Sequence, residues 1–338
     1  MIILGIETSC DETAVALVKD GTEVLSSLVA TQLELHRPFK GVVPELASRA
    51  HLETLVPLLK EMMEEVAVTP EDVDAIAFTR GPGLIGALLV GVSLGKALAY
   101  SWGVPPIGVN HLKAHLYAPC LEGNVLEFPV VGLIVSGGHT LLIEADSWES
   151  ARILGGTRDD AAGESFDKVA CLLDLGFPGG PAVEKAARDG DPERFQLPRP
   201  MIKSGDYDFS FSGVKTAVRY LVERIERDGK PIPTADIAAG FQAAAVDVLI
   251  SKLITAANAC RAHTVVLGGG VIRNGYLRRE VQAAFSSGRH QLLISSPEFC
   301  SDNAAMIAGL GGRILERGGG GDWEIDADPN LPWGEGLL

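Results

Sequence analysis

The sequence has few cysteines and no pattern that would organise them. Its 338 residues include 5 cysteines, an odd number, and no two of them form a CxxC pair. Disulfide-stabilised secreted domains and structural zinc modules both depend on paired cysteines. We therefore expect a reducing compartment, the cytoplasm, with neither a disulfide framework nor a structural zinc site.

We expect neither a targeting leader nor a membrane span. Residues 1–7 carry no basic cluster and no cleavage site, and their apolar pattern indicates a strand. The longest apolar run, from Leu84 to Tyr100, is short for a span and is interrupted by glycines and by Lys96. It predicts a buried core helix, and we expect no membrane association.

Positive charge is scarce as well. The 29 Lys and Arg residues stand against 44 Asp and Glu, which gives a formal net charge of -15. A nucleic-acid-binding protein normally has a basic footprint, so action on RNA would need a local basic patch or a helper subunit. The candidate basic contacts are Arg37, Lys40, Arg49, Arg199 and Lys203.

Two segments of the chain share one order of predicted elements. The first has strands over 2–7, 13–18 and 24–29, a helix over 44–63, a strand over 75–79 and a long helix from residue 84. The second has strands over 130–135, 141–144 and 151–154, a helix over 161–175, another within 235–262 and a strand over 264–267. These periodicities predict a duplicated α/β fold, with two similar domains facing each other across a cleft.

Composition suggests where the domains end. We place the first domain at residues 1–127 and the second at 128–320, with an inserted loop near 188–214 and an acidic tail at 321–338. The insert is rich in Asp, Pro and Gly, and loops of this length are often functional or mobile. Glycines followed by acidic residues lead us to expect a solvated tail.

A pair of histidines is the clearest candidate for a metal site. His111 and His115 are four residues apart, so on a helix both imidazoles point the same way and can share one ion. A third ligand is required, and Asp302 is the candidate because it follows an apolar strand and opens a helix of small residues. A polar helix face without an ion would show the same spacing.

Glycine-rich turns follow strands at matching points of the two segments. The sequences SGG at 136–138 and GGG at 268–270 can each present successive backbone N–H groups to an anion, which favours a nucleotide over a plain turn. The chain contains no Walker sequence. The GxGxxG match at 81–86 contains Pro82 and lacks the acidic residue about twenty positions further on, so we interpret it as incidental.

Two acidic residues occupy the turn after the first strand. Adjacent acids such as Asp11 and Glu12 are usually solvated. Beside a nucleotide they could instead hold a metal, orient a ribose or act as a base.

Longer motifs resemble the bacterial tRNA threonylcarbamoyladenosine transferase family, from residue 1 to about residue 312. They are IETSCDET at 6–13, GVVPELASR at 41–49, His111 with His115, VSGGHT at 135–140, DDAAGE at 159–164, FDK at 166–168, FPGGP at 177–181, FSFSG at 209–213 and PEFCSDN at 297–303. The resemblance implies an actin-like fold of duplicated ribonuclease-H-like domains, shared with Hsp70-type ATPases and sugar kinases.

The implied reaction moves a threonylcarbamoyl group from threonylcarbamoyl-adenylate to the exocyclic N6 amine of the adenosine after the anticodon of ANN-decoding tRNAs, with release of AMP. The implied partners are tRNA, a separate adenylate-forming enzyme, a degenerate paralogue subunit and a small P-loop ATPase.

The resemblance also assigns roles to residues of this sequence. His111, His115 and Asp302 would bind one divalent ion, which is iron in the family's usual description, with zinc as the alternative. Backbone groups would hold the adenylate at Ile134, Val135, Ser136, Gly137 and Gly138, and its ribose and adenine would be fixed by Asp167, Gly180 and Asn274. We expect Asp11 or Glu12 to orient or deprotonate the attacking amine. The sequence departs from relatives at Asn110, often a histidine, and at 328–330, often basic.

Three other functions compete with this interpretation. A metallopeptidase of the zincin type needs a glutamate directly after the first histidine, and that position is Leu112. An ATP-dependent kinase of the same fold would need phosphate loops and acids but no metal trio. A non-catalytic scaffold would be expected to have lost a ligand, whereas His111, His115 and Asp302 are all present.

Overall fold

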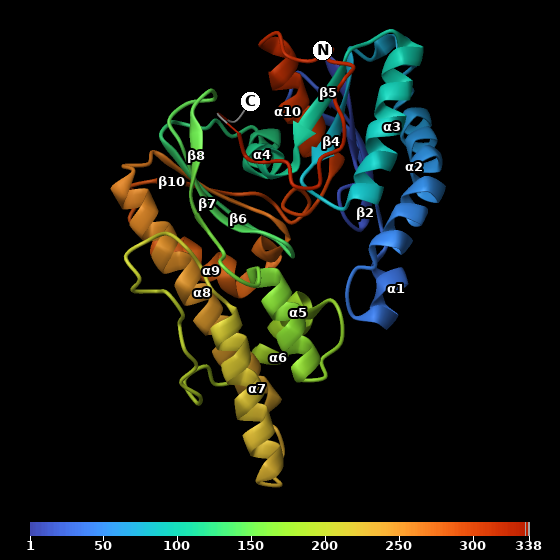
Figure 1. Ribbon diagram of the computed structural model, residues 1–338. Helices are drawn as coiled ribbons and strands as arrows, with labels where there is room; N and C mark the ends of the chain where they lie inside the picture. Colours follow the sequence, from blue (N-terminus) through green and yellow to red (C-terminus); the bar gives the residue numbers. More distant parts are fainter. Residues whose placement is uncertain (335, 337–338) are drawn as a thin grey trace. The chain divides into compact units, whose positions relative to one another are not determined.

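Two units, each built on one mixed sheet, make up the computed structural model, which describes residues 1–334 and 336 (Figure 1). Unit 1 contains Met1–Leu126 together with the chain from Ser295 onward, and unit 2 contains Glu127–Ile294. The predicted second domain, 128–320, is therefore corrected at its C-terminal end. Residues 304–316 form a helix that packs on the unit 1 sheet, although they follow unit 2 in the sequence.

The unit 1 sheet consists of β1 (Ile2–Glu7), β2 (Glu12–Lys19), β3 (Glu23–Thr31), β4 (Ala75–Gly81) and β5 (Pro106–Asn110). Its order is β3-β2-β1-β4-β5. The first three strands form an antiparallel meander, whereas β4 runs parallel to β1 and β5 runs parallel to β4. The carboxyl ends of β1, β4 and β5 consequently meet at one edge of the sheet.

Helices cover both faces of this sheet. The helices of unit 1 are α1 (Leu33–His36), α2 (Pro44–Val66), α3 (Ile85–Trp102), α4 (His111–Tyr117) and α10 (Ala304–Glu316), with 3-10 turns η1 (Arg37–Phe39), η2 (Pro70–Asp72) and η3 (Ala118–Glu122). Side chains alternate along β1, so Leu4 and Ile6 join the core with α2 and α3 while Gly5 faces α10. A Cβ on Gly5 would lie 2.2 Å from the backbone oxygen of Ala304, which explains the glycine.

Unit 2 repeats the topology of unit 1. Its strands are β6 (Val130–Val135), β7 (Thr140–Ala145), β8 (Ala151–Gly156), β9 (Thr264–Gly268) and β10 (Gln291–Ile294), in the order β10-β9-β6-β7-β8. Again a three-strand meander is extended by two parallel strands. The predicted duplicated α/β fold is thus confirmed.

The helices of unit 2 surround a large apolar core. They are α5 (Ala162–Leu172), α6 (Gly179–Ala187), α7 (Ser212–Arg227), α8 (Thr234–Ala259), the 3-10 turn η4 (Gly270–Arg273) and α9 (Gly275–Ala284). Within residues 188–211, all of them described, no helix or strand forms. The insert ends earlier than predicted, at α7, because Asp159 accepts hydrogen bonds from the hydroxyls of Ser210 and Ser212 while Phe209 and Phe211 are buried.

Two further predictions differ from the structure. The acidic tail is not a solvated extension over its described part, because the side chains of Ile325 and Trp333 are only 8% and 6% exposed. The long apolar helix exists as α3, but Leu89 and Tyr100 are 44% and 80% exposed, so only one face of it is buried.

By length and composition, α3 and α8 are both apolar enough to cross a membrane, and the buried shares of their apolar windows are 33% and 78%. A core helix passes the same test, so this finding is weak evidence for a span.

Candidate active site

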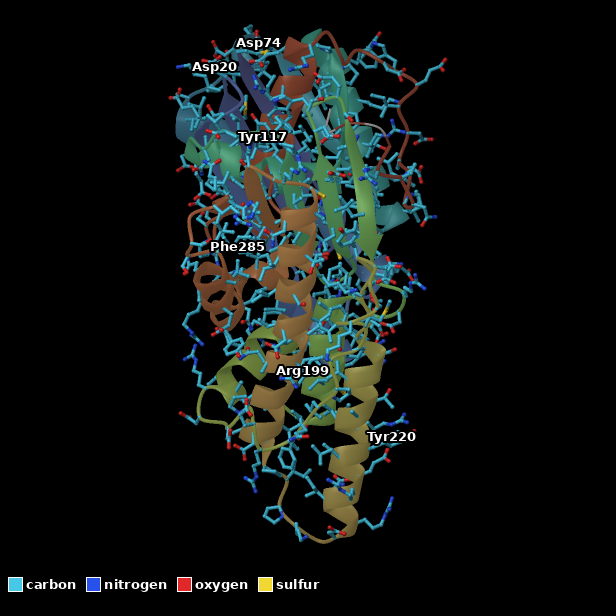
Figure 2. The ribbon with its side chains drawn as sticks, turned by 90° about the vertical axis from the view of Figure 1, so that its left-hand side faces the viewer. Asp20, Asp74, Tyr117, Arg199, Tyr220 and Phe285 are labelled. Atoms are coloured by element: carbon cyan, nitrogen blue, oxygen red, sulfur yellow. The ribbon has the colours of Figure 1, made fainter. Side chains whose placement is uncertain are left out.

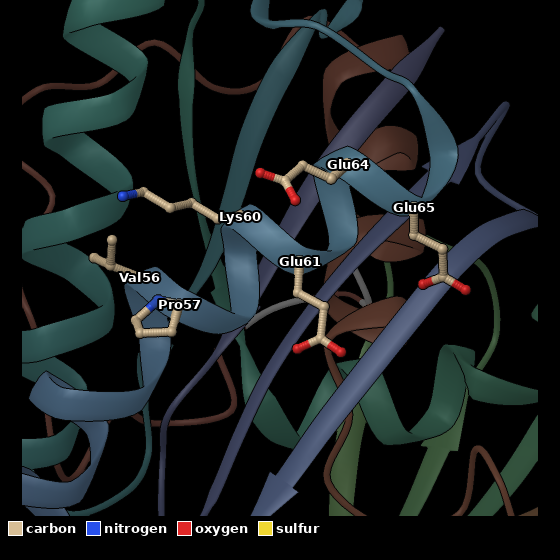
Figure 3. Close-up of a pocket in the computed structure, with 6 residues that line it drawn as sticks. All are labelled: Val56, Pro57, Lys60, Glu61, Glu64 and Glu65. Atoms are coloured by element: carbon tan, nitrogen blue, oxygen red, sulfur yellow. The ribbon is translucent and has the colours of Figure 1, made fainter.

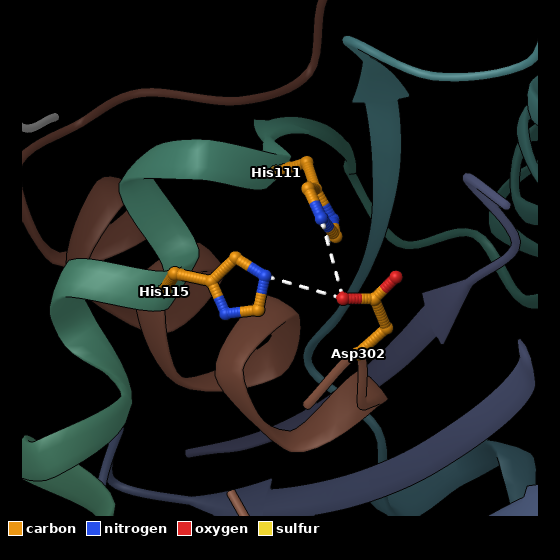
Figure 4. A group of neighbouring side chains, drawn as sticks. All are labelled: His111, His115 and Asp302. Carbon is orange, nitrogen blue, oxygen red and sulfur yellow. Dashed lines mark ion pairs between the residues drawn. The ribbon is translucent and has the colours of Figure 1, made fainter. Parts of the chain in front are cut away.

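Three side chains of unit 1 converge where the sequence predicted a metal site (Figure 4). Strand β5 leads directly into α4, whose first residue is His111 and whose next turn carries His115. Asp302 lies just before α10, which packs against α4. Its Oδ1 is 3.5 Å from the Nε2 of His111 and 3.2 Å from the Nε2 of His115.

This geometry fits a small divalent ion. Ligands about 2.0–2.1 Å from a tetrahedral ion are roughly 3.3 Å from one another. The two distances to Asp302 match that spacing, and the ligand atoms of the three residues all lie within 4.8 Å of one another. The Nδ1 of the fully buried His115 has no hydrogen-bond partner among the described residues, and its Nε2 faces the carboxylate of Asp302. A buried imidazole whose Nε2 is aimed at a carboxylate is suited to sharing a metal ion with it.

Glu7 completes the cluster, although no sequence pattern predicted a role for it. It ends β1, and its fully buried Oε2 lies 2.9 Å from the Nδ1 of His111. The same carboxylate accepts hydrogen bonds from the hydroxyl of Thr79 at 2.6 Å and from the backbone N–H of Ser9. A carboxylate on the far nitrogen of a histidine fixes its tautomer and leaves Nε2 available for an ion.

The cluster shifts the pKa values of His111, His115 and Glu7. Burial disfavours the imidazolium of His111, but the carboxylates of Asp302 and Glu7 outweigh it and raise the pKa of His111 to about 9. Burial lowers the pKa of His115, with Asp302 acting in the opposite direction. Burial also works against the carboxylate of Glu7, yet the contact with His111 keeps the pKa of Glu7 below its ordinary value. The site therefore already holds charge of both signs.

The acidic turn predicted to be catalytic lies within electrostatic reach of the cluster. Asp11 and Glu12 connect β1 to β2, and the hydroxyl of Thr31 donates to Glu12 at 3.2 Å. Burial, then the charges of Asp11 and Asp302 and a side-chain hydrogen bond to Asp11, raise the pKa of Glu12 to about 9. Glu12 thus keeps a proton near neutral pH.

In unit 2, the two predicted glycine turns leave the sheet at the same edge. Strands β6 and β9 are parallel and paired, with Ile134 opposite Gly268, so the segments 136–138 and 269–270 emerge side by side. Ile134 and Val135 are buried strand residues, and Ser136 begins a tight turn in which its hydroxyl accepts from the N–H of His139 at 3.1 Å. Ligands bind at this edge in open α/β sheets.

The close packing in this region falls on Gly163 and Gly269, of which only Gly269 belongs to a predicted glycine turn, and not on Gly137 or Gly138. A Cβ on Gly137 or Gly138 would meet nothing within 4 Å. By contrast, a Cβ on Gly163 would lie 2.6 Å from the backbone oxygen of Ser136, and one on Gly269 would lie 2.4 Å from that of Val135. Gly163 and Gly269 therefore let α5 and η4 approach the strand end, and the backbone of 137–138 faces open space.

The remaining predicted nucleotide contacts lie in the same part of unit 2. Asp167, on α5, accepts from the N–H of Gly179 at 2.7 Å and so holds the start of α6, where Gly180 has open space around it. Asn274 caps α9 by accepting from Leu277 at 2.9 Å, and its amide donates to Gln242 at 2.8 Å. The side chain of Asn274 is therefore already engaged in packing α9.

A surface hollow on unit 1 is unrelated to this chemistry. It has a volume of about 640 Å³ and lies along α2, and Figure 3 shows its lining side chains, Val56, Pro57, Lys60, Glu61, Glu64 and Glu65. Its three carboxylates project from one helix face and do not converge on a point (Figure 3). We interpret it as a solvated acidic face.

Comparison with known proteins places the chain in a family. The model of the family "tRNA N6-adenosine threonylcarbamoyltransferase" matches residues 23–309. A relative with that name from Thermosipho africanus is 46% identical over 331 residues, covering 98% of this chain and 99% of its own. Another from Symbiobacterium thermophilum is 50% identical over 338 residues, covering 99% and 98%. The chain belongs to the tRNA N6-adenosine threonylcarbamoyltransferase family.

Solved structures support the fold of this threonylcarbamoyltransferase family member. HypF of T. kodakarensis superimposes with a TM-score of 0.63 at 16% identity, covering 94% of this chain and 48% of its own. Component A of the (R)-2-hydroxyglutaryl-CoA dehydratase of Acidaminococcus fermentans gives 0.55 at 15% identity, covering 94% and 99%. At such identities the likeness concerns the fold alone, and it confirms the predicted actin-like, duplicated ribonuclease-H-like class.

The matches to the family model and to the relatives confirm the predicted family. They also confirm that the chain is an enzyme, a transferase that acts in tRNA modification. Individual roles within the threonylcarbamoyltransferase site stay predictions. The structure brings His111, His115 and Asp302 together as predicted and adds Glu7. No local pattern marks Glu7, since its side-chain partners Thr79 and His111 are 72 and 104 residues away in the sequence.

Proposed function

We propose that this chain transfers the threonylcarbamoyl group of threonylcarbamoyl-adenylate to N6 of the adenosine after the anticodon in ANN-decoding tRNAs, releasing AMP. The observation that carries the proposal is the His111, His115 and Asp302 cluster, backed by Glu7, in a chain of the threonylcarbamoyltransferase family. The proposal includes a cytoplasmic location, a degenerate paralogue and a small P-loop ATPase as partners.

His111, His115 and Asp302 would hold one divalent ion, iron or zinc, with Glu7 fixing the tautomer of His111. When bound, an ion with an open coordination position supplies Lewis-acid polarisation of a carbonyl. In unit 2, the backbone from Ile134 to Gly138 would hold the adenylate, and Asp167, Gly180 and Asn274 would lie along its ribose and adenine. The parallel ends of β6 and β9 support this assignment.

Asp11 and Glu12 divide the proton chemistry in this proposal. Glu12, with a pKa of about 9, keeps a proton near neutral pH. Asp11, its neighbour in the turn, is the proposed acceptor of the proton from the attacking amine. An Asp11→Asn protein should transfer far more slowly while it still binds the adenylate and the ion. Full transfer activity in that variant would eliminate this role.

The isolated chain should bind tRNA weakly. Of the candidate basic contacts, Arg37 pairs with Glu34 at 2.8 Å, and Arg49 pairs with Glu45 at 2.7 Å. Arg199, labelled in Figure 2, pairs with Asp247 of α8 at 2.8 Å. With these charges neutralised and a net charge of -15, a partner subunit would have to supply the basic surface. Tight, salt-sensitive binding by the chain alone would contradict this.

The deciding experiment is a complete reaction. Purified protein, the partner subunits, the adenylate-forming enzyme, threonine, bicarbonate, ATP and unmodified tRNA are mixed, and the nucleosides are examined by mass spectrometry. We expect threonylcarbamoyl-adenosine with the wild type and with His263→Ala, an exposed histidine of unit 2, but not with His111→Ala.

Metal content of the same three proteins, measured by plasma mass spectrometry, separates the ion from the reaction. We expect a bound ion in the wild type and in His263→Ala and none in His111→Ala. If no product forms although every component is shown to be active, the transferase proposal fails. Phosphorylation of a sugar or carboxylate substrate would then favour the kinase.

A further inference from the structure

The described part of the acidic tail folds back onto unit 1. We call residues 325–333 the C-terminal strap. Its two large apolar side chains, Ile325 and Trp333, are 8% and 6% exposed, whereas Trp323, just before it, is 44% exposed. The backbone oxygen of Ile325 accepts from the ammonium of Lys96 on α3 at 3.0 Å. Burial at both ends fixes the course of the strap over unit 1.

The middle of the strap occupies the turn between β4 and α3. The N–H of Asp328 donates to the backbone oxygen of Arg80 at 2.8 Å, and the N–H of Gly83 donates to that of Pro329 at 3.2 Å. A Cβ on Gly81 would lie 1.9 Å from the oxygen of Asp328, so only glycine permits this approach. The backbone of the strap thus lies against the turn that carries the GxGxxG match at 81–86. This agrees with the interpretation of that match as incidental.

The end of the strap holds the first turn of α4. Asn110, the residue before His111, caps that helix because its Oδ1 accepts from the N–H groups of Leu112 and Lys113 at 3.0 and 3.3 Å. The amide nitrogen of the same side chain donates to the backbone oxygen of Pro332 at 3.2 Å. The ammonium of Lys113 lies 5.7 Å from the ring centroid of Trp333, a cation–π contact.

We infer that the C-terminal strap is a positioning element for the candidate metal centre, acting through Asn110 and Lys113 on α4. This helix has only 7 residues, and it carries both histidines of the cluster. Most of its residues are buried, and α10 packs against it, while the strap contacts its first turn through Asn110 and Lys113. Contacts to that turn help to set where His111 and His115 point, and metal affinity is sensitive to the orientation of ligands.

The inference rests on the proposed function only for its metal readout. Its structural part concerns the metal-free protein, in which the strap should protect the backbone of α4 from hydrogen exchange. Detached from the strap, Asn110 would keep its cap but lose the contact with Pro332, and α4 would tilt and fray more often.

Two tryptophans of the same segment give a matched pair of variants. Trp333→Ala removes the buried side chain on α4, whereas Trp323→Ala removes an exposed one whose ring meets Tyr100 edge to face at 6.1 Å. Hydrogen–deuterium exchange of the metal-free proteins is followed by mass spectrometry in peptides covering 81–84 and 110–117. Release of zinc from the loaded proteins is followed with a chromophoric chelator.

We expect Trp333→Ala to accelerate exchange in both peptides and to release zinc about tenfold to hundredfold faster, the range found when the groups that support metal ligands are lost. Trp323→Ala should change neither the exchange of these peptides nor the release of zinc. Exchange in peptides of α8 should be unchanged in either variant. Unchanged exchange at 110–117 in a folded Trp333→Ala protein would overturn the inference.

If Trp333→Ala fails to fold, Asn110→Ser answers the same question. Serine can still cap α4 with its hydroxyl but cannot donate to Pro332 as the amide does. Faster exchange and faster zinc release in this variant support the strap, and wild-type behaviour in both overturns it. Faster exchange in protein that binds no zinc at all would uphold the strap while the proposed metal site fails.

Discussion

Replacing Glu7 by glutamine tests whether the buried carboxylate tunes the candidate metal centre. The two side chains have the same shape, but an amide has only one accepting oxygen. In the wild type, one carboxylate oxygen faces the N–H of Ser9, and the other faces both the hydroxyl of Thr79 and the Nδ1 of His111. Glutamine cannot satisfy this set in either orientation.

If the amide oxygen faces Ser9, the amide nitrogen faces the Nδ1 of His111. The Nδ1 of His111 must then accept a hydrogen bond from the amide, so the ring proton moves to Nε2. Nε2 is the atom that is aimed at Asp302 and that an ion would need. If the amide is turned round, its NH2 group faces the N–H of Ser9, so two donors oppose each other in a fully buried position. Either arrangement should weaken metal binding about tenfold to hundredfold, or roughly 1.4 to 2.8 kcal/mol.

The assay is competition for zinc or cobalt between the protein and a chromophoric chelator, with Glu144→Gln as control. Glu144 is also buried, on β7, where it pairs with Arg152 at 2.5 Å, and its loss should not change the affinity. Wild-type affinity in a folded Glu7→Gln protein would show that Glu7 does not control the tautomer of His111. Equal losses in both variants would point to a general effect of disturbing a buried carboxylate.

Three other outcomes follow from the same geometry. The pKa of His111 is raised to about 9, and an ion needs the neutral imidazole. Zinc added at pH 7 should therefore release about one proton, and it should bind more weakly at lower pH. An indicator dye would detect the released proton, and none should appear above pH 10. Gly5→Ala would place a Cβ 2.2 Å from a backbone oxygen of α10 and should cost about 1–3 kcal/mol in urea unfolding, whereas Gly41→Ala, with nothing within 4 Å, should change stability little. Gly81→Ala would place a Cβ 1.9 Å from a strap oxygen and should reproduce the faster exchange of α4 expected for Trp333→Ala, so wild-type exchange would contradict the strap contact.

The duplicated fold could be predicted because its evidence is local and occurs twice. Apolar runs of strand length, separated by polar turns, mark β1 to β3 and again β6 to β8. The spacing of His111 and His115 is likewise a local pattern, since one helical turn brings the two rings to 4.7 Å between centroids. Predictions of this kind need only the period of a strand or a helix.

Glu7 could not be recognised as part of the site in the same way. It is one residue of an apolar strand, and its partners Thr79 and His111 reach it only because β1, β4 and β5 lie parallel and in register. Helix α7 also escaped prediction, because its start depends on Asp159 and two buried phenylalanines of the insert. Such contacts depend on the assembled sheet and loop, which no sequence window contains.

The C-terminal end of the chain shows the same limit with a larger consequence. Periodicity identifies a helix of small residues after Asp302, but it does not tell which sheet that helix will cover. The choice of unit 1 depends on steric fit, because glycines at 5 and 311 allow α10 to approach β1 and β4 closely. Two single apolar residues, Ile325 and Trp333, then anchor the acidic tail to unit 1 by their burial.

Unit 1 is thus completed by sequence that follows all of unit 2. The chain up to Leu126 carries His111, His115 and Glu7, but the third candidate ligand, the helix covering the second face of the sheet and the strap over α4 all come after Ser295. Two glycines of that first stretch allow these later parts to approach: Gly5 leaves room for α10, and Gly81 leaves room for the strap. The candidate metal centre therefore depends on a contact between the two ends of unit 1, and its geometry is set by how the C-terminal chain docks as much as by the His-x-x-x-His spacing itself.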